Sequence, residues 1–224
     1  MMSNLFSIFD PNTSLSYQMN WFSSLLNLFL FPSLFWVINS RILNFLIFFS
    51  MKLLNELKMI MLNKFNMMNM IFFYVMFFLI LLNNFMGLFP YIFTSSSHMI
   101  FSLSISLPMW LSMILFILFK NLTFFFSHLI PQGTPYILMP FMVLIETISN
   151  VIRPGTLVIR LTANMIAGHL LLTLMSSSMY SLSIYLTLLI LFFQNFLMFL
   201  EFSVSIIQSY VFMILSTLYS KETN

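Results

Sequence analysis

Residues 156–175 read TLVIRLTANMIAGHLLLTLM, an apolar run of about 20 residues with Arg160 inside it. A run of this length is what a transmembrane helix needs. An ionised side chain deep in hydrocarbon costs at least about 2.5 kcal/mol, and such residues usually have a function. The run therefore indicates a membrane protein, and Arg160 is its first candidate functional residue.

The composition of the whole chain supports this class. Of 224 residues, 61% are hydrophobic and only 6% are charged, whereas soluble domains carry about 25% charged residues. The net charge of +3 is small and scattered, which argues against a nucleic-acid partner. With no cysteine and three isolated histidines, we expect neither a metal site nor a cofactor. No cleavable signal peptide is expected, because the first 20 residues are polar.

The first 65 residues predict one membrane span followed by a surface helix. The apolar block 21–38 is long enough to cross a membrane, with Pro32 as a kink. From Lys52 to Lys64 apolar and polar residues alternate with helical periodicity. Such a pattern is typical of an amphipathic helix that lies on a membrane surface.

Residues 66–120 contain two further apolar runs. Residues 67–89 and 103–119 predict membrane spans, the latter kinked at Pro108 and ending at Lys120. The segments 90–98 and 121–135 contain the Pro, Gly and Ser residues that mark loops, so both are predicted to be loops.

The last part, residues 136–219, predicts a hairpin of two long helices. Residues 184–219 contain no glycine or proline, and as one helix they reach about 54 Å against a hydrocarbon core of about 30 Å. Such a helix must tilt steeply or protrude. The serine-rich link 176–183 turns it back against residues 136–175. The expected fold is a single all-α, polytopic membrane domain over 1–224, with about five embedded helices and one amphipathic surface helix.

The basic residues predict the orientation, because lysine and arginine favour the matrix or cytoplasmic side. Counting spans from the first one places loop 90–100 and link 176–183 outside. It places Lys120 and Lys221 inside. The basic residues that fix the inner end of the first predicted span are Arg41, Lys52, Lys58 and Lys64.

Around Arg160 the helical period places small residues on one face. Asn164 and then Ala167 and Gly168 follow Arg160 at four, seven and eight positions, and Ala163 lies beside them. A surface of small residues lets a partner helix approach closely. His169, about 13.5 Å further along the helix, points away from the arginine face.

Two more polar lines run along the predicted hairpin. Polar lines on long embedded helices fit water-accessible paths better than lipid contact. The first line contains Glu146, Asn150 and Arg153, and the second contains Gln194, Glu201 and Gln208. Glu146 falls toward the inner end of the membrane and His169 toward the outer end, so titratable groups face both sides.

Each of these residues also has a purely structural interpretation. Arg160 is close enough to Gly155 to act as an interfacial anchor. Glu146 and Arg153 fit a structural ion pair, and His169 fits a hydrogen-bonded packing residue. The two glutamines, Gln194 and Gln208, fit interhelical hydrogen bonds.

Several segments together carry a family resemblance. They are RLTANMIAGH at 160–169, HLIPQGTP at 128–135, ETISNVIRP at 146–154, IQSYVF at 207–212 and NNFMGLFPY at 83–91. With these motifs the chain closely resembles the subunit a family of F-type ATP synthase in its mitochondrially encoded form. The resemblance is strongest over residues 125–215 and loose over residues 1–65.

The resemblance implies a proton-translocating stator subunit of the Fo sector in the mitochondrial inner membrane. Its expected partners are a ring of c subunits, subunit b, supernumerary subunits, membrane lipids and the transported proton. Arg160 falls on the position of the family's essential arginine. Glu146 matches the inner access route, and the proton-path positions are matched by Asn164, His169, Glu201 and Gln208. Asn150, on the polar line with Glu146, is predicted to belong to the proton path as well.

The residues themselves leave two other classes of function to consider. A secondary transporter that binds an anion at Arg160 would show inverted repeats with broken helices, and no such symmetry is visible. A purely structural membrane subunit would not need titratable groups at two depths. The chain has no Walker-type or dinucleotide motif, so any ATP chemistry belongs to another subunit.

Overall fold

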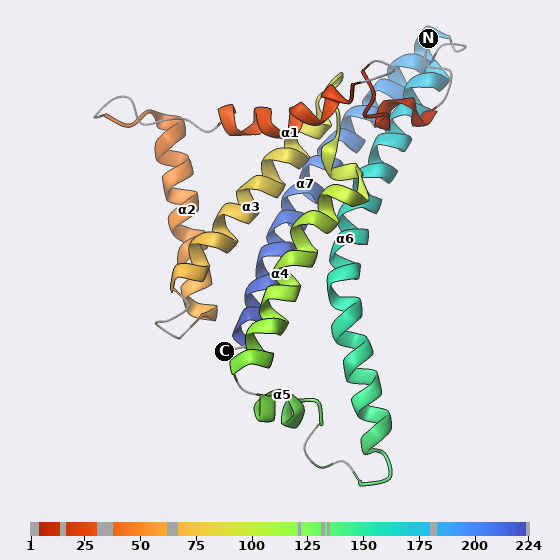
Figure 1. Cartoon of the computed structure of the whole chain (residues 1–224). Helices are drawn as coiled ribbons and strands as arrows, with labels where there is room; N and C mark the ends of the chain where they lie inside the picture. The colour runs from red at the N-terminus through yellow and green to blue at the C-terminus, as the bar shows by residue number, and fades with distance from the viewer. Residues whose placement is uncertain are drawn as a thin grey trace.

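The computed structural model is a bundle of long helices (Figure 1). It describes residues 5–13, 17–30, 38–61, 67–120, 122–130, 133, 135–179 and 183–222. The five long helices are α2 (Arg41–Ile60), α3 (Met67–Leu88), α4 (Met99–Lys120), α6 (Met139–Ser178) and α7 (Ile184–Glu222). Of these, α3, α4, α6 and α7 are long and apolar enough to cross a membrane. The prediction of an all-α, multi-pass membrane protein is confirmed.

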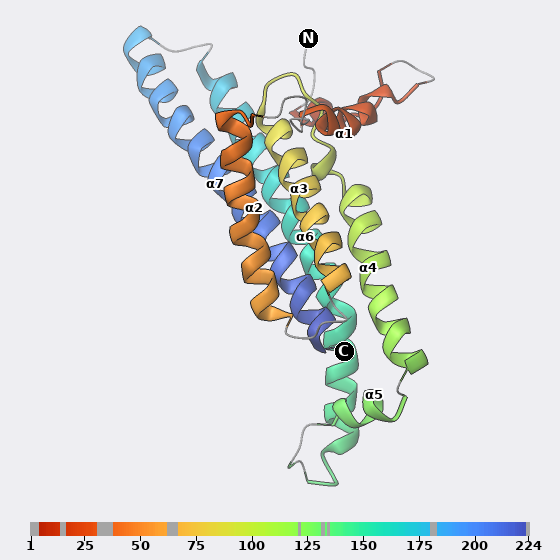
Figure 2. The same cartoon turned by 90° about the vertical axis from the view of Figure 1, so that its left-hand side faces the viewer.

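The predicted hairpin is also confirmed. The helices α6 and α7 pack against each other and run antiparallel (Figures 1 and 2). Pro154 lies inside α6 without ending it, although its missing N–H removes one backbone hydrogen bond from the helix. The bundle has two ends. We call the end with residues 90–98 and the α6–α7 link the outer end, and the end with the C-terminus the inner end.

The core lies where α7 packs against its neighbours, α2, α3 and α6. One cluster joins Leu57 of α2 and Phe77 of α3 to Met213 of α7, all at most 1% exposed. A second cluster joins α3, α6 and α7 through Ile80, Leu157 and Phe212. Burying each such side chain contributes about 1.5–3 kcal/mol in water. These contacts fix the position of α6 and α7 relative to the rest of the chain.

The structure differs from the expectation for residues 21–38. Instead of one long helix, Met19–Leu30 forms consecutive short turns: the 3-10 helix η2 (Met19–Phe22), α1 (Ser23–Leu26) and the 3-10 helix η3 (Asn27–Leu30). These turns lie across the outer end of the bundle (Figure 1). The remainder of the predicted span, residues 31–37, lies outside the described residues.

The first long helix is therefore α2, which contains most of the predicted surface helix. Ser40 caps its first turn by accepting a hydrogen bond from the backbone N–H of Leu43, at 3.3 Å. Leu53 and Leu57 face inward, as the amphipathic pattern predicted. However, α2 runs from the outer to the inner end of the bundle and approaches α3 toward the inner end (Figure 1). Arg41, the first residue of α2, therefore lies at the outer end, whereas the sequence predicted it at the inner end. Lys64 lies outside the described residues.

The two predicted loops contain short helices. The segment after α4 forms α5 (Leu122–His128), and the segment after α3 contains the 3-10 helix η5 (Ser95–Ser97). All three serines of η5 are buried, and the Oγ of Ser95 donates to Oδ1 of Asn83 at 3.1 Å. Asn27 of η3 also donates to this Oδ1. These hydrogen bonds join the crosswise N-terminal turns to the outer end of α3.

The outer halves of α6 and α7 have a large exposed apolar surface. In Figure 2 their linked ends extend beyond the ends of the neighbouring helices. Between Ile184 and Leu200 of α7 no side chain is buried by this chain. Exposed apolar patches of this size indicate contact with lipid or with another subunit.

Candidate functional site

The candidate site is a line of polar contacts between α6 and α7. The side chain of Gln208 on α7 donates from Nε2 to the backbone carbonyl of Arg160 on α6, at 3.5 Å. Nearer the outer end, the carboxyl group of Glu201 lies against Gly168. Residue numbers fall from 168 to 160 on α6 while they rise from 201 to 208 on α7. This is the order of contacts that antiparallel helices require. The two contacts therefore belong to one interhelical register.

Arg160 projects from the outside of this helix pair. Its side chain is exposed, and so are those of Ala163, Asn164 and Ala167. Val158, on the opposite face of α6, is only 2% exposed. Among the described residues the guanidinium of Arg160 has no hydrogen-bond or ion-pair partner. The arginine thus faces outward across a surface of small residues, as the helical period predicted.

Gly168 does not belong to that outward surface, although the sequence placed it there. A Cβ atom at this position would lie 2.7 Å from both Cδ and Oε1 of Glu201, so only glycine leaves room for the carboxyl group. Gly168 is half-buried against α7, while Ala163 and Ala167 are exposed. The reason is angular: eight residues on a helix turn through about 800°, which rotates Gly168 about 80° away from Arg160.

Glu201, Gln208 and His169 each have a buried polar atom without a hydrogen-bond partner among the described residues. These atoms are Oε1 of Glu201, Oε1 of Gln208 and Nε2 of His169. Buried polar atoms are rarely left unpaired, because each costs about 1–3 kcal/mol. Each such atom calls for a further partner, such as an ordered water. Five other atoms of this kind, in Asn27, Asn84, Ser96 and Ser106, lie elsewhere in the described part of the chain.

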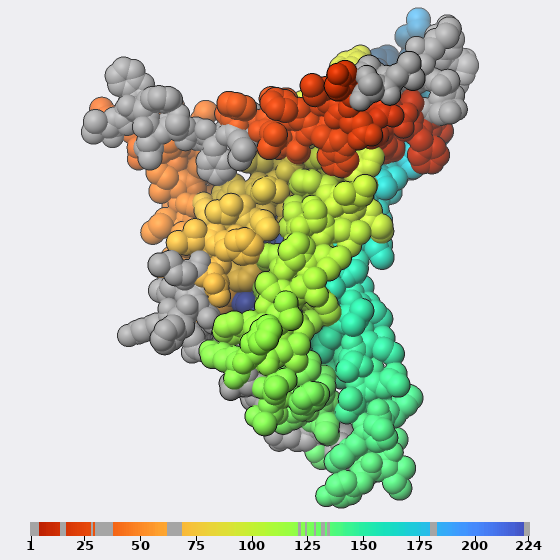
Figure 3. Space-filling model, viewed as in Figure 1, coloured from red at the N-terminus to blue at the C-terminus, as the bar shows by residue number. Residues whose placement is uncertain are grey.

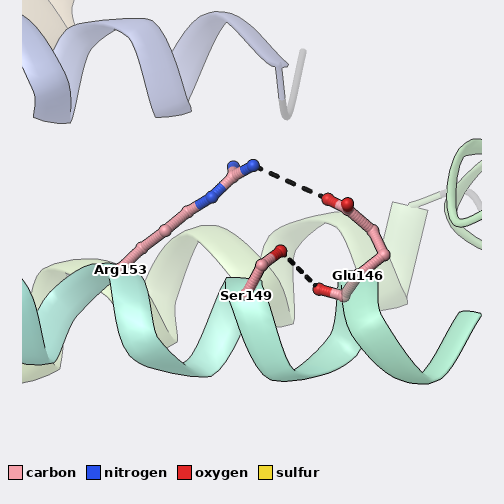
Figure 4. A network of polar contacts seen from close by, with 3 residues as sticks. All are labelled: Glu146, Ser149 and Arg153. Carbon is pink, nitrogen blue, oxygen red and sulfur yellow. Dashed lines mark hydrogen bonds and ion pairs between the residues drawn. The ribbon is translucent and has the colours of Figure 1, made fainter. Parts of the chain in front are cut away.

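A second polar group lies near the inner end of α6. Figure 4 shows Arg153 reaching back two turns toward Glu146, with 3.6 Å between Nη2 and Oε1. Ser149 donates from Oγ to the backbone carbonyl of Glu146 at 2.8 Å. The guanidinium of Arg153 also lies 5.2 Å from the ring centre of Tyr219 on α7. The ion pair that the sequence suggested is therefore formed.

The two remaining predicted residues, Asn150 and Gln194, lie on α6 and α7 with the polar residues already described. Asn150 is half-buried between Glu146 and Arg153 on α6, and Gln194 is half-buried on α7. Two contacts of the site were not predicted. The first is the packing of Glu201 on Gly168, and the second is an edge-to-face contact between the rings of Phe9 and His169. The only sequence signal for the first was the rarity of glycine, which occurs four times in the chain.

A multi-pass helical bundle that carries titratable groups at several depths, and an arginine without a partner in the described part of the chain, is typical of an ion-translocating membrane subunit. Comparison with known proteins names the family. The family described as ATP synthase A chain matches residues 14–221. The chain is 54% identical over 224 residues to ATP synthase subunit a of Locusta migratoria, with 99% of each chain covered. It is 51% identical over 224 residues to ATP synthase subunit a of Drosophila melanogaster, with 100% of each chain covered.

The chain therefore belongs to the ATP synthase A chain family. This confirms the predicted function as a proton-translocating stator subunit of the Fo sector. Such a subunit works with the rest of the Fo sector. The family does not itself say which side chains of this sequence carry the proton.

Proposed function

We propose that Arg160 is the stator charge that meets an ionised carboxylate on a passing rotor helix. The observation that carries this proposal is its exposed guanidinium, which lacks a partner among the described residues and stands among small side chains. In hydrocarbon an unpaired cation is costly, so a counter-charge from another chain is expected. Exposed Ala163 and Ala167 leave room for a helix of a c-subunit ring to approach.

The outer half-channel in this proposal uses His169 and Glu201. Both carry buried polar atoms without partners among the described residues, and both can bind and release a proton. Glu201 hands the proton toward the rotor carboxylate, while Asn164 and Gln208 line the step between Glu201 and Arg160. Gln208 supports this role because its Nε2 donates to the backbone of Arg160 itself.

The inner half-channel uses Glu146 and Asn150. Fourteen residues separate Glu146 from Arg160, which is about 21 Å along α6. Glu146 is 36% exposed, so water reaches it from the inner end. A proton that leaves the rotor on this side passes Glu146, whose carboxylate is held in place by Arg153.

Arg160 separates the two half-channels. An arginine guanidinium is not deprotonated in proteins, so Arg160 keeps its positive charge. A proton crossing directly from His169 to Glu146 would have to pass this fixed positive charge. Instead the proton travels on the rotor, and each one that crosses about 100 mV releases about 2.3 kcal/mol for rotation.

The expected location is the mitochondrial inner membrane. The supporting observations are the insect relatives named ATP synthase subunit a and the four helices that are long and apolar enough to span a membrane. In this setting the partners are the c-subunit ring, subunit b and supernumerary subunits. Lipids cover the remaining apolar surface, and nucleotide chemistry takes place in the peripheral sector.

The decisive test replaces Arg160 in the assembled synthase. Arg160→Ala should abolish ATP-driven proton pumping in proteoliposomes, and Arg160→Lys should restore little of it, because lysine lacks the planar fork and loses its proton more easily. Arg41→Ala, a change of the same kind at the start of α2, should leave pumping intact. Normal coupling in the Arg160→Ala enzyme would refute the proposed role.

A second test asks whether the exposed face meets the rotor. The chain contains no cysteine, so Ala163→Cys introduces a single thiol for cross-linking to a cysteine on the rotor helix. Val158→Cys is the matched control, because Val158 is only 2% exposed and faces the interior of the bundle. We expect disulfide formation with position 163 and not with position 158. The opposite result would mean that another face of α6 meets the rotor.

A further inference from the structure

The N-terminal 3-10 helix η1 (Leu5–Phe9) packs against α6 and contacts His169. The rings of Phe9 and His169 meet edge to face, with 6.3 Å between their centres and 85° between their planes. Figure 3 shows the red atoms of the N-terminal segment across the outer end of the bundle, next to α6. Phe9 thus packs directly against the proposed half-channel residue His169.

Phe9 is held in this place by His98, from the segment between α3 and α4. The Nε2 of His98 lies 2.8 Å from the backbone carbonyl oxygen of Phe9. A carbonyl oxygen can only accept, so Nε2 carries the hydrogen in this contact. His98, in the loop after α3, therefore donates a hydrogen bond to Phe9 near the N-terminus.

His98 is itself fixed by two aromatic rings. Its ring stacks on Phe93 with 5.1 Å between centres, and lies 5.2 Å from the centre of the Trp21 ring. Ser23 donates from Oγ to the backbone carbonyl of Phe93 at 3.1 Å. These contacts join three separate segments of the chain into one unit, which we call the outer cover: Phe9, Trp21, Phe93 and His98.

We propose that His98 is a positioning residue that holds Phe9 over His169 and thereby sets how readily His169 is reached from the outer side. The Nε2 of His169, whose ring contacts Phe9, is buried and has no partner among the described residues. The consequence for proton flow rests on the proposed function of His169, whereas the control of access does not. His98 acts through Phe9 and does not need to carry the proton itself.

The test measures access to His169 directly in the assembled synthase. Diethyl pyrocarbonate modifies neutral imidazoles, and mass spectrometry of peptides reports the rate at His169 alone. Losing a hydrogen bond of average strength should open the cover about fivefold more often. We therefore expect His98→Ala to raise the modification rate of His169 about fivefold, and Phe9→Ala to raise it at least as much.

Two further variants separate this proposal from general loosening. His98→Gln places an amide Nε2 where it can still donate to Phe9, so the modification rate should stay close to that of the unchanged protein. Phe6→Ala removes a ring from the same 3-10 helix, but Phe6 is 65% exposed and should not affect the rate. The proposal is overturned if His98→Ala has no effect, if His98→Gln reacts as fast as His98→Ala, or if Phe6→Ala matches Phe9→Ala.

Proton flux measured in the same variants separates the two proposals. A faster modification of His169 together with unchanged flux would leave the outer cover established and refute the entry role of His169. If the flux falls in both His98→Ala and His98→Gln while access stays normal in the glutamine variant, then His98 transfers protons itself. That result would overturn its assignment as a positioning residue.

Discussion

The inner and outer halves of the α6–α7 hairpin handle their titratable groups in opposite ways. In the inner half Glu146 has a cation, Arg153, at 3.6 Å, and both side chains are about one-third exposed. In the outer half Glu201 and His169 have buried polar atoms without partners among the described residues. One carboxyl group is paired at the surface, and the other lies against Gly168 of the neighbouring helix with one oxygen buried.

This difference indicates where the chain gives up stability for function. An ion pair at an exposed surface contributes at most about 1 kcal/mol and requires little of its surroundings. A buried carboxyl oxygen without a partner costs more, about 1–3 kcal/mol. The outer half keeps this arrangement at the level of Gly168, where the missing side chain leaves room for the carboxyl group in its present orientation. Proton transfer in the outer half should therefore be the more sensitive to small changes.

The largest effect among the tests of this comparison is expected for Glu201→Gln. The amide keeps the shape of the carboxyl group but cannot carry a proton, so passive conductance through Fo should fall by about 100-fold. Assembly of the complex should be unaffected. Glu56→Gln is the control, since Glu56 is exposed and accepts a hydrogen bond from Tyr210 that an amide oxygen can also accept. Equal conductance in the two variants would remove Glu201 from the path.

A smaller effect on conductance is expected when the space beside Gly168, which the carboxyl group of Glu201 occupies, is filled. In Gly168→Ala the new methyl group would lie 2.7 Å from the carboxyl group of Glu201. This distance is too short, so the carboxyl group, which is the mobile end of its side chain, must rotate away. Conductance should fall about tenfold. The free energy of unfolding of the complex should fall by at most about 3 kcal/mol. These are measured by proton flux in proteoliposomes and by thermal denaturation.

Gly155 offers the matched control in the same helix. A Cβ atom at Gly155 would meet nothing within 4 Å, and alanine favours a helix over glycine by about 0.5–1 kcal/mol in water. Gly155→Ala should therefore keep both conductance and stability. If the two alanine variants behave alike, then space at Gly168 does not determine the position of Glu201.

The sequence predicted the second half of this fold well and the first part less well. Residues 184–219 contain no glycine or proline that would end a helix, so the sequence predicted one continuous helix. The structure confirms this, because α7 runs from Ile184 to Glu222. The apolar block at 21–38 met the same length criterion, yet Met19–Leu30 forms short turns. Asn27 has a buried tertiary partner in Asn83, and no local pattern could reveal it.

Within the site, the limit of prediction was the contact between helices. The helical period was enough to place Arg160, Ala163 and Ala167 on one exposed face. It could not place Gly168 against Glu201, because that contact depends on the register of α6 against α7. The contact between Phe9 and His169 joins residues 160 positions apart and likewise depends on tertiary packing.

The smallest effect concerns the inner ion pair, and it distinguishes a structural pair from a proton carrier. Glu146→Gln removes a titratable group that water can partly replace, so pumping should slow about threefold. Arg153→Gln breaks the same ion pair but leaves the carboxyl group, so pumping should be nearly unchanged. Either change should lower the stability of the complex by at most about 1 kcal/mol, as expected for a partly exposed pair. Equal, minor slowing in both variants would assign the pair a structural role only, and the inner half-channel would then have to follow other groups.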